Sequence, residues 1–194
     1  MAKLKLGILG SGNGSNFRSI AAAISVGALD AEVRIVISDM ENAGILALAR
    51  ERKIRAEFVA PGQFKTKLAP EAEERVVALL REAEVELVVL AGWMRMIKAP
   101  LLEAFPRRII NIHPSLLPAF PGLESWKQAL AAGARETGCT VHYVDTGMDT
   151  GEIIAQSRVP VFPSDTPEEL HARIQNAEHE LYPAVIGEFA RKAE

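Results

Sequence analysis

In the first half of the chain, short and continuously apolar runs alternate with segments of helical periodicity. No other feature of the sequence limits the possible folds as strongly as this alternation. Strands are predicted in the runs at residues 4–9, 31–38, 56–60, 85–92 and 107–113. Between them, apolar side chains recur every three or four residues. Strands that are apolar throughout are buried on both faces, so helices should cover both sides of a mostly parallel sheet.

The second half of the chain has a different pattern. Two strand-like runs, at residues 138–145 and 153–161, flank a tight turn-rich connection and should pair antiparallel. A long helix should then begin with a capping box formed by Thr166 and Glu169. Pro183 should kink or end that helix, because proline lacks the backbone N–H of a helical residue.

The length of 194 residues suits one domain. We expect residues 1–194 to form a single-domain, Rossmann-like, doubly wound α/β fold. Its mostly parallel sheet should carry an antiparallel strand near the C-terminal end, followed by a long C-terminal helix.

Composition narrows the classes of partner. The formal net charge is -3, so no general attraction to nucleic acid or to an anionic membrane is expected. No segment approaches the roughly 20 apolar residues of a membrane span, and no signal peptide is apparent, which predicts a cytoplasmic protein. The single cysteine, Cys139, excludes an intrachain disulfide and a multi-thiolate metal site; we expect it to be a buried spectator.

Small residues at 10–17, "GSGNGSNF", connect the first predicted strand to the first helix. They match the dinucleotide-binding fingerprint G-x-G-x-x-G only loosely, because Ser15 stands at the position of the third glycine. Asp39 lies slightly too far along the sequence for the acidic residue that contacts the ribose in that motif. Backbone N–H groups that converge at a helix N-terminus favour a phosphate, and Ser15 and Asn16 could add donors. The alternative is a tight turn with a serine cap.

An amide and an imidazole alternate at the end of the strand in "NIHPSLLP". Alternate residues of a strand share a face, so Asn111 and His113 should point the same way. Pro114 ends the strand there, at the carboxyl edge where ligands bind in open α/β sheets. Such a pair can polarise a carbonyl and stabilise an oxyanion. The alternative is a structural pair that anchors the proline-rich loop.

Two Asp-Thr-Gly triplets form the segment "VDTGMDTG" at residues 144–151. Asp145 or Asp149 could orient His113 and favour its protonated form, or the segment could be a solvated turn. No second histidine lies near His113 in the sequence, which argues against a histidine-based metal site, although a carboxylate-only Mg²⁺ site stays open.

Five segments in this order, "SGNGSN", "VLAGWMRMI", "NIHPSLLPAFPG", "TGCTVHYVDTGMDTG" and "EHELYP", resemble the folate-dependent phosphoribosylglycinamide formyltransferases over nearly the whole chain. The resemblance implies formyl transfer from 10-formyltetrahydrofolate, a co-substrate, to the amine of 5'-phosphoribosylglycinamide in purine biosynthesis. It also implies small-molecule partners only, no metal, and a monomer or homodimer.

The resemblance also implies roles for individual residues. The catalytic residues would be Asn111, His113 and Asp149. The substrate-binding residues would be Gly14, Ser15, Asn16, Gln175 and Glu178. The folate-binding residues would be Lys67, Met94, Arg95, Met96, Ile97, Asn111, Asp145 and Asp149.

The chain departs from the family pattern at Glu124, where many relatives carry histidine, at Trp126, and at Glu152, where proline is common. Two alternative functions stay open. One is hydrolysis of 10-formyltetrahydrofolate, in which water replaces the amine; such enzymes usually carry an extra N-terminal domain, whereas the first strand here is expected from Leu4. The other is a non-enzymatic phosphate- or nucleotide-binding module.

Overall fold

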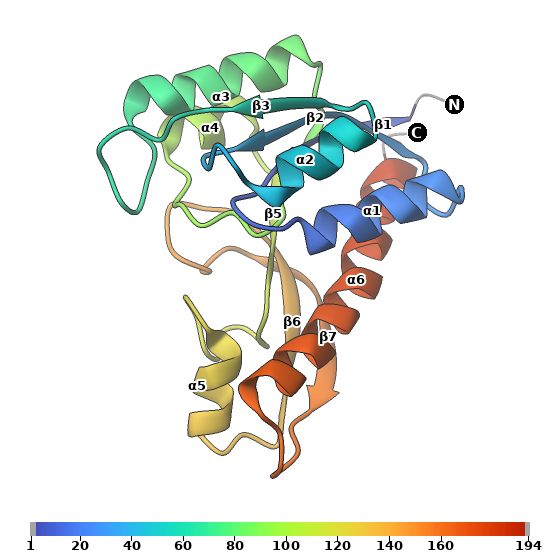
Figure 1. Cartoon of the computed structure of the whole chain (residues 1–194), viewed down its shortest axis with the longest axis vertical. Coiled ribbons are helices and arrows are strands. Elements are labelled where there is room, and N and C mark those ends of the chain that lie inside the picture. Colours follow the sequence, from blue (N-terminus) through green and yellow to red (C-terminus); the bar gives the residue numbers. More distant parts are fainter. Residues whose placement is uncertain (1–2, 193–194) are drawn as a thin grey trace.

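The computed structural model describes residues 3–192 and contains one seven-stranded sheet with helices on both faces (Figure 1). The strands are β1 (Leu4–Leu9), β2 (Ala31–Ser38), β3 (Arg55–Phe58), β4 (Leu87–Leu90), β5 (Ile109–His113), β6 (Glu136–Tyr143) and β7 (Ile153–Pro160). The helices are α1 (Ser15–Ser25), α2 (Gly44–Glu51), α3 (Pro70–Glu82), α4 (Ala99–Ala104), α5 (Ser125–Ala131) and α6 (Pro167–Lys192).

The strand order is β3-β2-β1-β4-β5-β6-β7, with parallel pairing from β3 through β5. β6 is antiparallel to both β5 and β7, so it alone runs against the other strands. This arrangement confirms the predicted doubly wound, mostly parallel sheet and its antiparallel strand. The connection between β6 and β7 is a loop over residues 144–152, longer than the tight turn that the sequence suggested.

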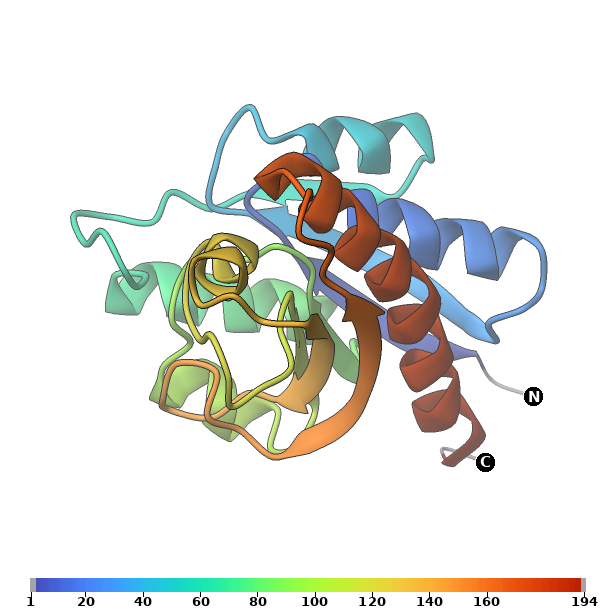
Figure 2. The ribbon, with the colours of Figure 1, turned by 90° about the horizontal axis from the view of Figure 1, so that it is seen from below.

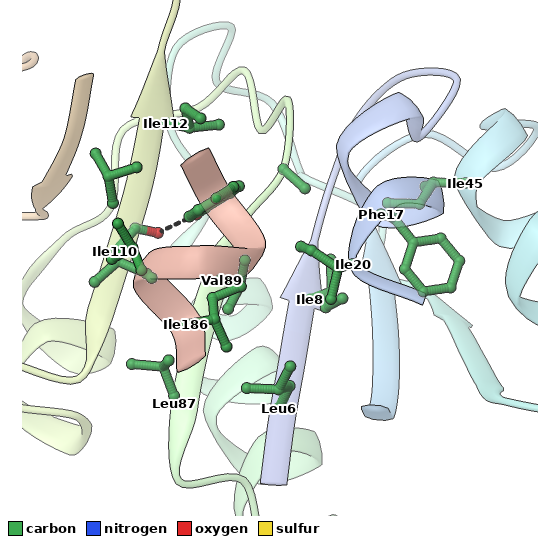
Figure 3. Packing of buried hydrophobic residues seen from close by; sticks show 14 of the residues in the cluster. Leu6, Ile8, Phe17, Ile20, Ile45, Leu87, Val89, Ile110, Ile112 and Ile186 are labelled. Carbon is green, nitrogen blue, oxygen red and sulfur yellow. Dashed lines mark hydrogen bonds between the residues drawn. The ribbon is translucent and has the colours of Figure 1, made fainter. Parts of the chain in front are cut away.

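Alternating side chains of the strands supply two hydrophobic cores, one on each face of the sheet. Leu6, Ile8, Val89 and Ile110 pack under α1, α2 and α6, as Figure 3 shows. Their neighbours along the strands, including Leu9, Leu90 and Ile109, face α3 and α4. Because both faces are covered, the central strands are apolar throughout.

The long C-terminal helix crosses one face of the sheet beside α1 (Figure 2). Its capping box is present: Thr166 Oγ1 accepts from the Glu169 backbone N–H at 3.2 Å, and Glu169 Oε2 accepts from the Thr166 backbone N–H at 2.8 Å. The prediction that Pro183 could end the helix is wrong, since α6 continues to Lys192. Fully buried Tyr182 and Ile186 anchor the helix to the core on either side of the proline.

The described residues include no helix that is long and apolar enough to cross a membrane. Cys139 is buried in β6, as predicted, and burial raises the pKa of its thiol to about 12.

Strand register places one row of residues across the sheet at the carboxyl ends of the parallel strands. Leu9 of β1 pairs with Leu90 of β4, Leu90 pairs with Asn111 of β5, and Asn111 pairs with His142 of β6. The loops that follow β1 and β4 therefore begin next to each other, and β5 continues beyond them to His113, at the edge where open α/β sheets bind ligands.

Candidate active site

Asn111 and His113 lie on the same face of β5, opposite to Ile110 and Ile112, as their alternation predicted. β5 extends past the end of β4, so His113 has a strand neighbour only in β6, where it pairs with Thr140. His113 is 5% exposed. The strand thus delivers an amide and a nearly buried imidazole to the sheet edge.

Both ring nitrogens of His113 face acceptor oxygens. Nε2 lies 3.0 Å from the Phe120 carbonyl oxygen, and Nδ1 lies 3.3 Å from Asp149 Oδ2. A neutral imidazole has one N–H donor, whereas the protonated ring has two. The Nε2 contact is a hydrogen bond, whereas the Nδ1 contact is at ion-pair distance and becomes an ion pair when the ring is protonated.

Asp149, and not Asp145, is the carboxylate beside His113. It has a left-handed backbone (φ 56°), and its Oδ2 also accepts from the Gly122 backbone N–H at 2.9 Å. Asp145 is occupied within its own loop, where it accepts from the Gly147 N–H at 3.0 Å and the Thr150 hydroxyl at 2.8 Å. The two alternatives left open by the sequence are thereby separated: one aspartate faces the imidazole and the other caps the loop.

His142 holds the side chain of Asn111. Its Nδ1 lies 2.8 Å from the Tyr143 carbonyl oxygen, which can only accept, so Nδ1 carries the proton. Nε2 is then free to accept from Asn111 Nδ2 at 3.2 Å. Burial lowers the pKa of His142 and so favours this neutral form. The sequence alone does not predict this contact, because it depends on the register between β5 and β6.

The first loop enters α1 through Gly14, which has a left-handed conformation (φ 76°). A Cβ at this position would lie 2.9 Å from Ile45 Cγ1, so the loop requires glycine for both reasons. Ser15 and Asn16 form the first turn of α1, where backbone N–H groups have no partner within the helix. This geometry is the one that the sequence predicted for a phosphate site.

Asn16 connects this loop to α6. Its Nδ2 donates to Glu178 Oε2 at 3.0 Å, while its Oδ1 is buried and has no hydrogen-bond partner among residues 3–192. Glu178 is 6% exposed, and burial raises the pKa of its carboxyl to about 7. The half-buried Gln175 lies nearly one turn earlier on α6.

Tyr182 fixes α6 against the end of the sheet, one turn after Glu178. Its hydroxyl lies 2.9 Å from the Leu90 carbonyl oxygen and 3.1 Å from the Ile110 carbonyl oxygen. Leu90 is the last residue of β4, and Ile110 directly precedes Asn111 in β5. Tyr182 thereby holds the part of α6 that carries Glu178 against β4 and β5, a role that the sequence did not predict.

The residues predicted to bind folate have different environments. Met94 is 62% exposed, Met96 is half-buried, and Ile97 is 3% exposed within the core against α3 and α4. Lys67 pairs with Met96 in an isolated bridge. The Arg95 side chain is turned inward, and its Nε donates to Asp39 Oδ2 at 2.6 Å. Within the 94–97 segment, Met94 is thus the most exposed side chain, and Ile97 is the most buried.

The three positions that depart from the family pattern make local contacts. Trp126 stacks on His171 with ring centroids 3.8 Å apart, which joins α5 to α6. Glu124 pairs with Lys127, and Glu152 pairs with Arg107 at 2.8 Å. The Arg107 guanidinium lowers the pKa of the Glu152 carboxyl. Within residues 3–192, no group of three or more His, Cys, Asp or Glu side chains is placed to hold a metal ion.

The α/β sheet thus carries Asn111 and His113 at its carboxyl edge, with Asp149 beside His113, and comparison with known proteins identifies the family of group-transfer enzymes. The formyl transferase family matches residues 4–186. The chain belongs to the formyl transferase family.

Individual relatives agree with this assignment. The chain is 43% identical over 182 residues to phosphoribosylglycinamide formyltransferase of Bacillus subtilis, covering 94% of this chain and 92% of that protein. It is similar to the crystal structure of glycinamide ribonucleotide transformylase 1 from Symbiobacterium toebii, with a TM-score of 0.93, 43% identity, and coverage of 98% and 89% of the two chains. A formyltetrahydrofolate deformylase from Pseudomonas syringae is similar at 25% identity, with a TM-score of 0.89; 98% of this chain aligns with 62% of that one.

Proposed function

We propose that this chain transfers the formyl group of 10-formyltetrahydrofolate to the amine of 5'-phosphoribosylglycinamide, a step of purine biosynthesis. The observation that carries the proposal is the contact between His113 and Asp149 on the face that Asn111 shares. The relatives that match most of both chains carry this activity in their names.

The reaction begins when the glycinamide amine attacks the formyl carbon and forms a C–N bond. The carbonyl electrons move onto oxygen, which gives a tetrahedral oxyanion. The bond between the formyl carbon and N10 of the folate then breaks as the carbonyl re-forms. The proton lost by the amine is delivered to N10, so tetrahydrofolate leaves without a net change in charge.

His113 acts as the general acid and as a donor to the oxyanion. The formyl oxygen takes the place of the Phe120 carbonyl as acceptor from Nε2–H. Asp149 stabilises the protonated ring through Nδ1, and preorganised charges of this kind contribute strongly because they need no rearrangement during the reaction.

Asn111 donates its second amide N–H to the same oxygen. The first N–H is committed to His142, which fixes the rotation of the amide about its side-chain bond. Asp149 also helps to relay the amine proton, through water. A donor that is already oriented avoids the entropic cost of being ordered during the reaction.

The ribonucleotide lies between the first loop and α6. Its phosphate is bound by backbone N–H groups of Gly14, Ser15 and Asn16. Glu178 and Gln175 contact the sugar or the glycinamide. The reduced folate lies along the 94–97 segment and the 145–149 loop, near Lys67.

A spectrophotometric assay of folate product, with and without 5'-phosphoribosylglycinamide, tests the proposal. The expected result is turnover that requires the ribonucleotide and yields formylated ribonucleotide in equal amount. Folate product formed equally without the ribonucleotide would establish hydrolysis, the alternative favoured by the similarity to the deformylase. Ribonucleotide binding without turnover would indicate a sensing module.

A further inference from the structure

A nearly buried ion pair joins loops that follow two different strands. Asp39 comes directly after β2 and Arg95 lies in the segment between β4 and α4. Arg95 Nε donates to Asp39 Oδ2 at 2.6 Å, and the two side chains are only 12% and 3% exposed. The mechanism proposed above uses neither side chain, although the family resemblance implied a folate contact for Arg95.

The same guanidinium holds a third loop, between β3 and α3. Arg95 Nη1 lies 2.7 Å from the Phe64 carbonyl oxygen, 3.0 Å from that of Lys65 and 3.3 Å from that of Lys67. Lysine could not replace this arrangement, because an ammonium is a compact point charge without the planar fork of a guanidinium.

Ser11 extends the contact to the first loop. Its hydroxyl donates to Asp39 Oδ1 at 2.6 Å and accepts from the Met94 backbone N–H at 3.1 Å. The Ser11 backbone N–H also donates to the Gly92 carbonyl at 3.0 Å. One oxygen of the Asp39 carboxylate thus accepts from Ser11 in the first loop, and the other accepts from Arg95 in the segment after β4.

We propose that Ser11, Asp39 and Arg95, here called the loop clamp, are positioning residues that hold the phosphate loop and the folate-binding segment in one arrangement. The inference rests on the function proposed above, in which these loops bind the two substrates. Loss of the loop clamp therefore weakens binding of both substrates together, although none of the three side chains is assigned a contact with either one.

The loop clamp should affect binding more than the chemical step. His113 and Asn111 are fixed by β5 and β6, and Asp149 by its contacts with Gly122 and His113. None of these contacts passes through the loop clamp. A mutation that only reduced stability would lower the amount of folded enzyme and leave both KM values unchanged.

Steady-state kinetics of Asp39→Asn and Arg95→Lys test this inference. We expect KM for both substrates to rise about tenfold or more, which is the loss expected for a charge-assisted hydrogen bond. The value of kcat at saturation should stay within about threefold of wild type. Asp165→Asn is the control, because Asp165 also forms an ion pair outside the loop clamp. Its side chain is 5% exposed, precedes α6 and lies 2.7 Å from Arg173 of α6, whose side chain is 26% exposed. The control should lower Tm and leave both KM values unchanged.

Ser11→Ala provides a gentler variant if the charge changes prevent folding. It removes one hydroxyl, keeps the ion pair, and should raise both KM values severalfold. KM values within twofold of wild type in every folded variant would overturn the proposal, and so would a rise for the folate alone or a loss confined to kcat. The assay of the wild-type enzyme tests the proposed transferase function separately from the loop clamp. Turnover of the wild type that does not depend on the ribonucleotide would refute the transferase function, whatever KM values the variants have.

Discussion

The two halves of the candidate site differ in how completely their polar groups are paired. On the side of β5 and β6, His113, Asn111, His142 and Asp149 all contact one another or the backbone. On the side of α1 and α6, Glu178 is bonded to Asn16, whose own Oδ1 has no partner within residues 3–192. Buried polar groups are costly to leave unpaired. The comparison teaches that the first half is the more completely paired, as the catalytic role proposed for it requires, while the second has an unpaired acceptor that the proposed ribonucleotide could use.

His113→Ala should produce the largest change. We expect turnover to fall about 10²–10⁴-fold, the usual contribution of a general acid, because the paired half would lose its proton donor. Rapid-quench or steady-state assays of the folded variant would measure the loss. Near-normal turnover would mean that His113 is a structural residue and that the comparison between the halves is mistaken.

Asp149→Asn should depress turnover less, by about 10²–10³-fold, while leaving the KM for the ribonucleotide nearly unchanged. The asparagine side chain keeps one acceptor oxygen but lacks the negative charge that Asp149 places beside the imidazole of His113. The pH dependence of kcat, measured next to that of wild type, would show whether the protonated ring has become harder to maintain. A change confined to ribonucleotide affinity would place Asp149 in the other half of the site.

Glu178→Gln tests the sparsely paired half through stability. Burial raises the pKa of Glu178 to about 7 from 4.5, so the native state binds more protons than the unfolded chain between these values. The stability that this protonation contributes is fully present below about pH 4.5 and is lost as the pH rises through about 7. The free-energy change has an upper limit of about 3 kcal/mol.

Denaturant unfolding of wild type and Glu178→Gln between pH 5 and 8 would measure this difference. Wild type should lose stability relative to the variant as the pH rises, and the variant should be the more stable of the two at pH 8. Parallel pH profiles would mean that Glu178 is not a strained carboxyl, and the contrast between the halves would disappear.

Trp126→Leu should have the smallest effect on activity and stability, because Trp126 lies outside both halves of the candidate site. Replacing the ring stacked on His171 by another apolar side chain should cost about 1 kcal/mol of stability. Turnover and both KM values should not change, because the stack only joins α5 to α6. Thermal unfolding with parallel kinetics would measure both. A selective rise in one KM would show that this departure from the family pattern alters specificity.

The sequence predicted the parts of the molecule that depend on local patterns. The alternation of apolar runs gave the parallel strands, and the spacing of Asn111 and His113 gave their common face. The missed features depend on contacts between distant segments. His142 reaches Asn111 only through antiparallel register, and Arg95 turns inward because Asp39 lies beside it.

Helix boundaries show the same limit. The helix α5 was not predicted, because it is short and enters through Glu124 in a left-handed conformation without a side-chain cap. α6 continues past Pro183 because Tyr182 and Ile186 are anchored in the core, and such tertiary packing overrides the local preference of proline. The roles of the individual site residues remain predictions that the experiments above test.

The burial of Cys139 makes the molecule convenient for site-specific labelling. It is the single cysteine of the sequence, and its thiol, with a pKa raised to about 12, is hardly ionised at neutral pH. Alkylating reagents attack the thiolate, so the native cysteine should stay unmodified. A new cysteine at exposed Met148 could then carry a fluorophore in an otherwise unaltered background, and its emission would report how the loop beside Asp149 responds to each substrate.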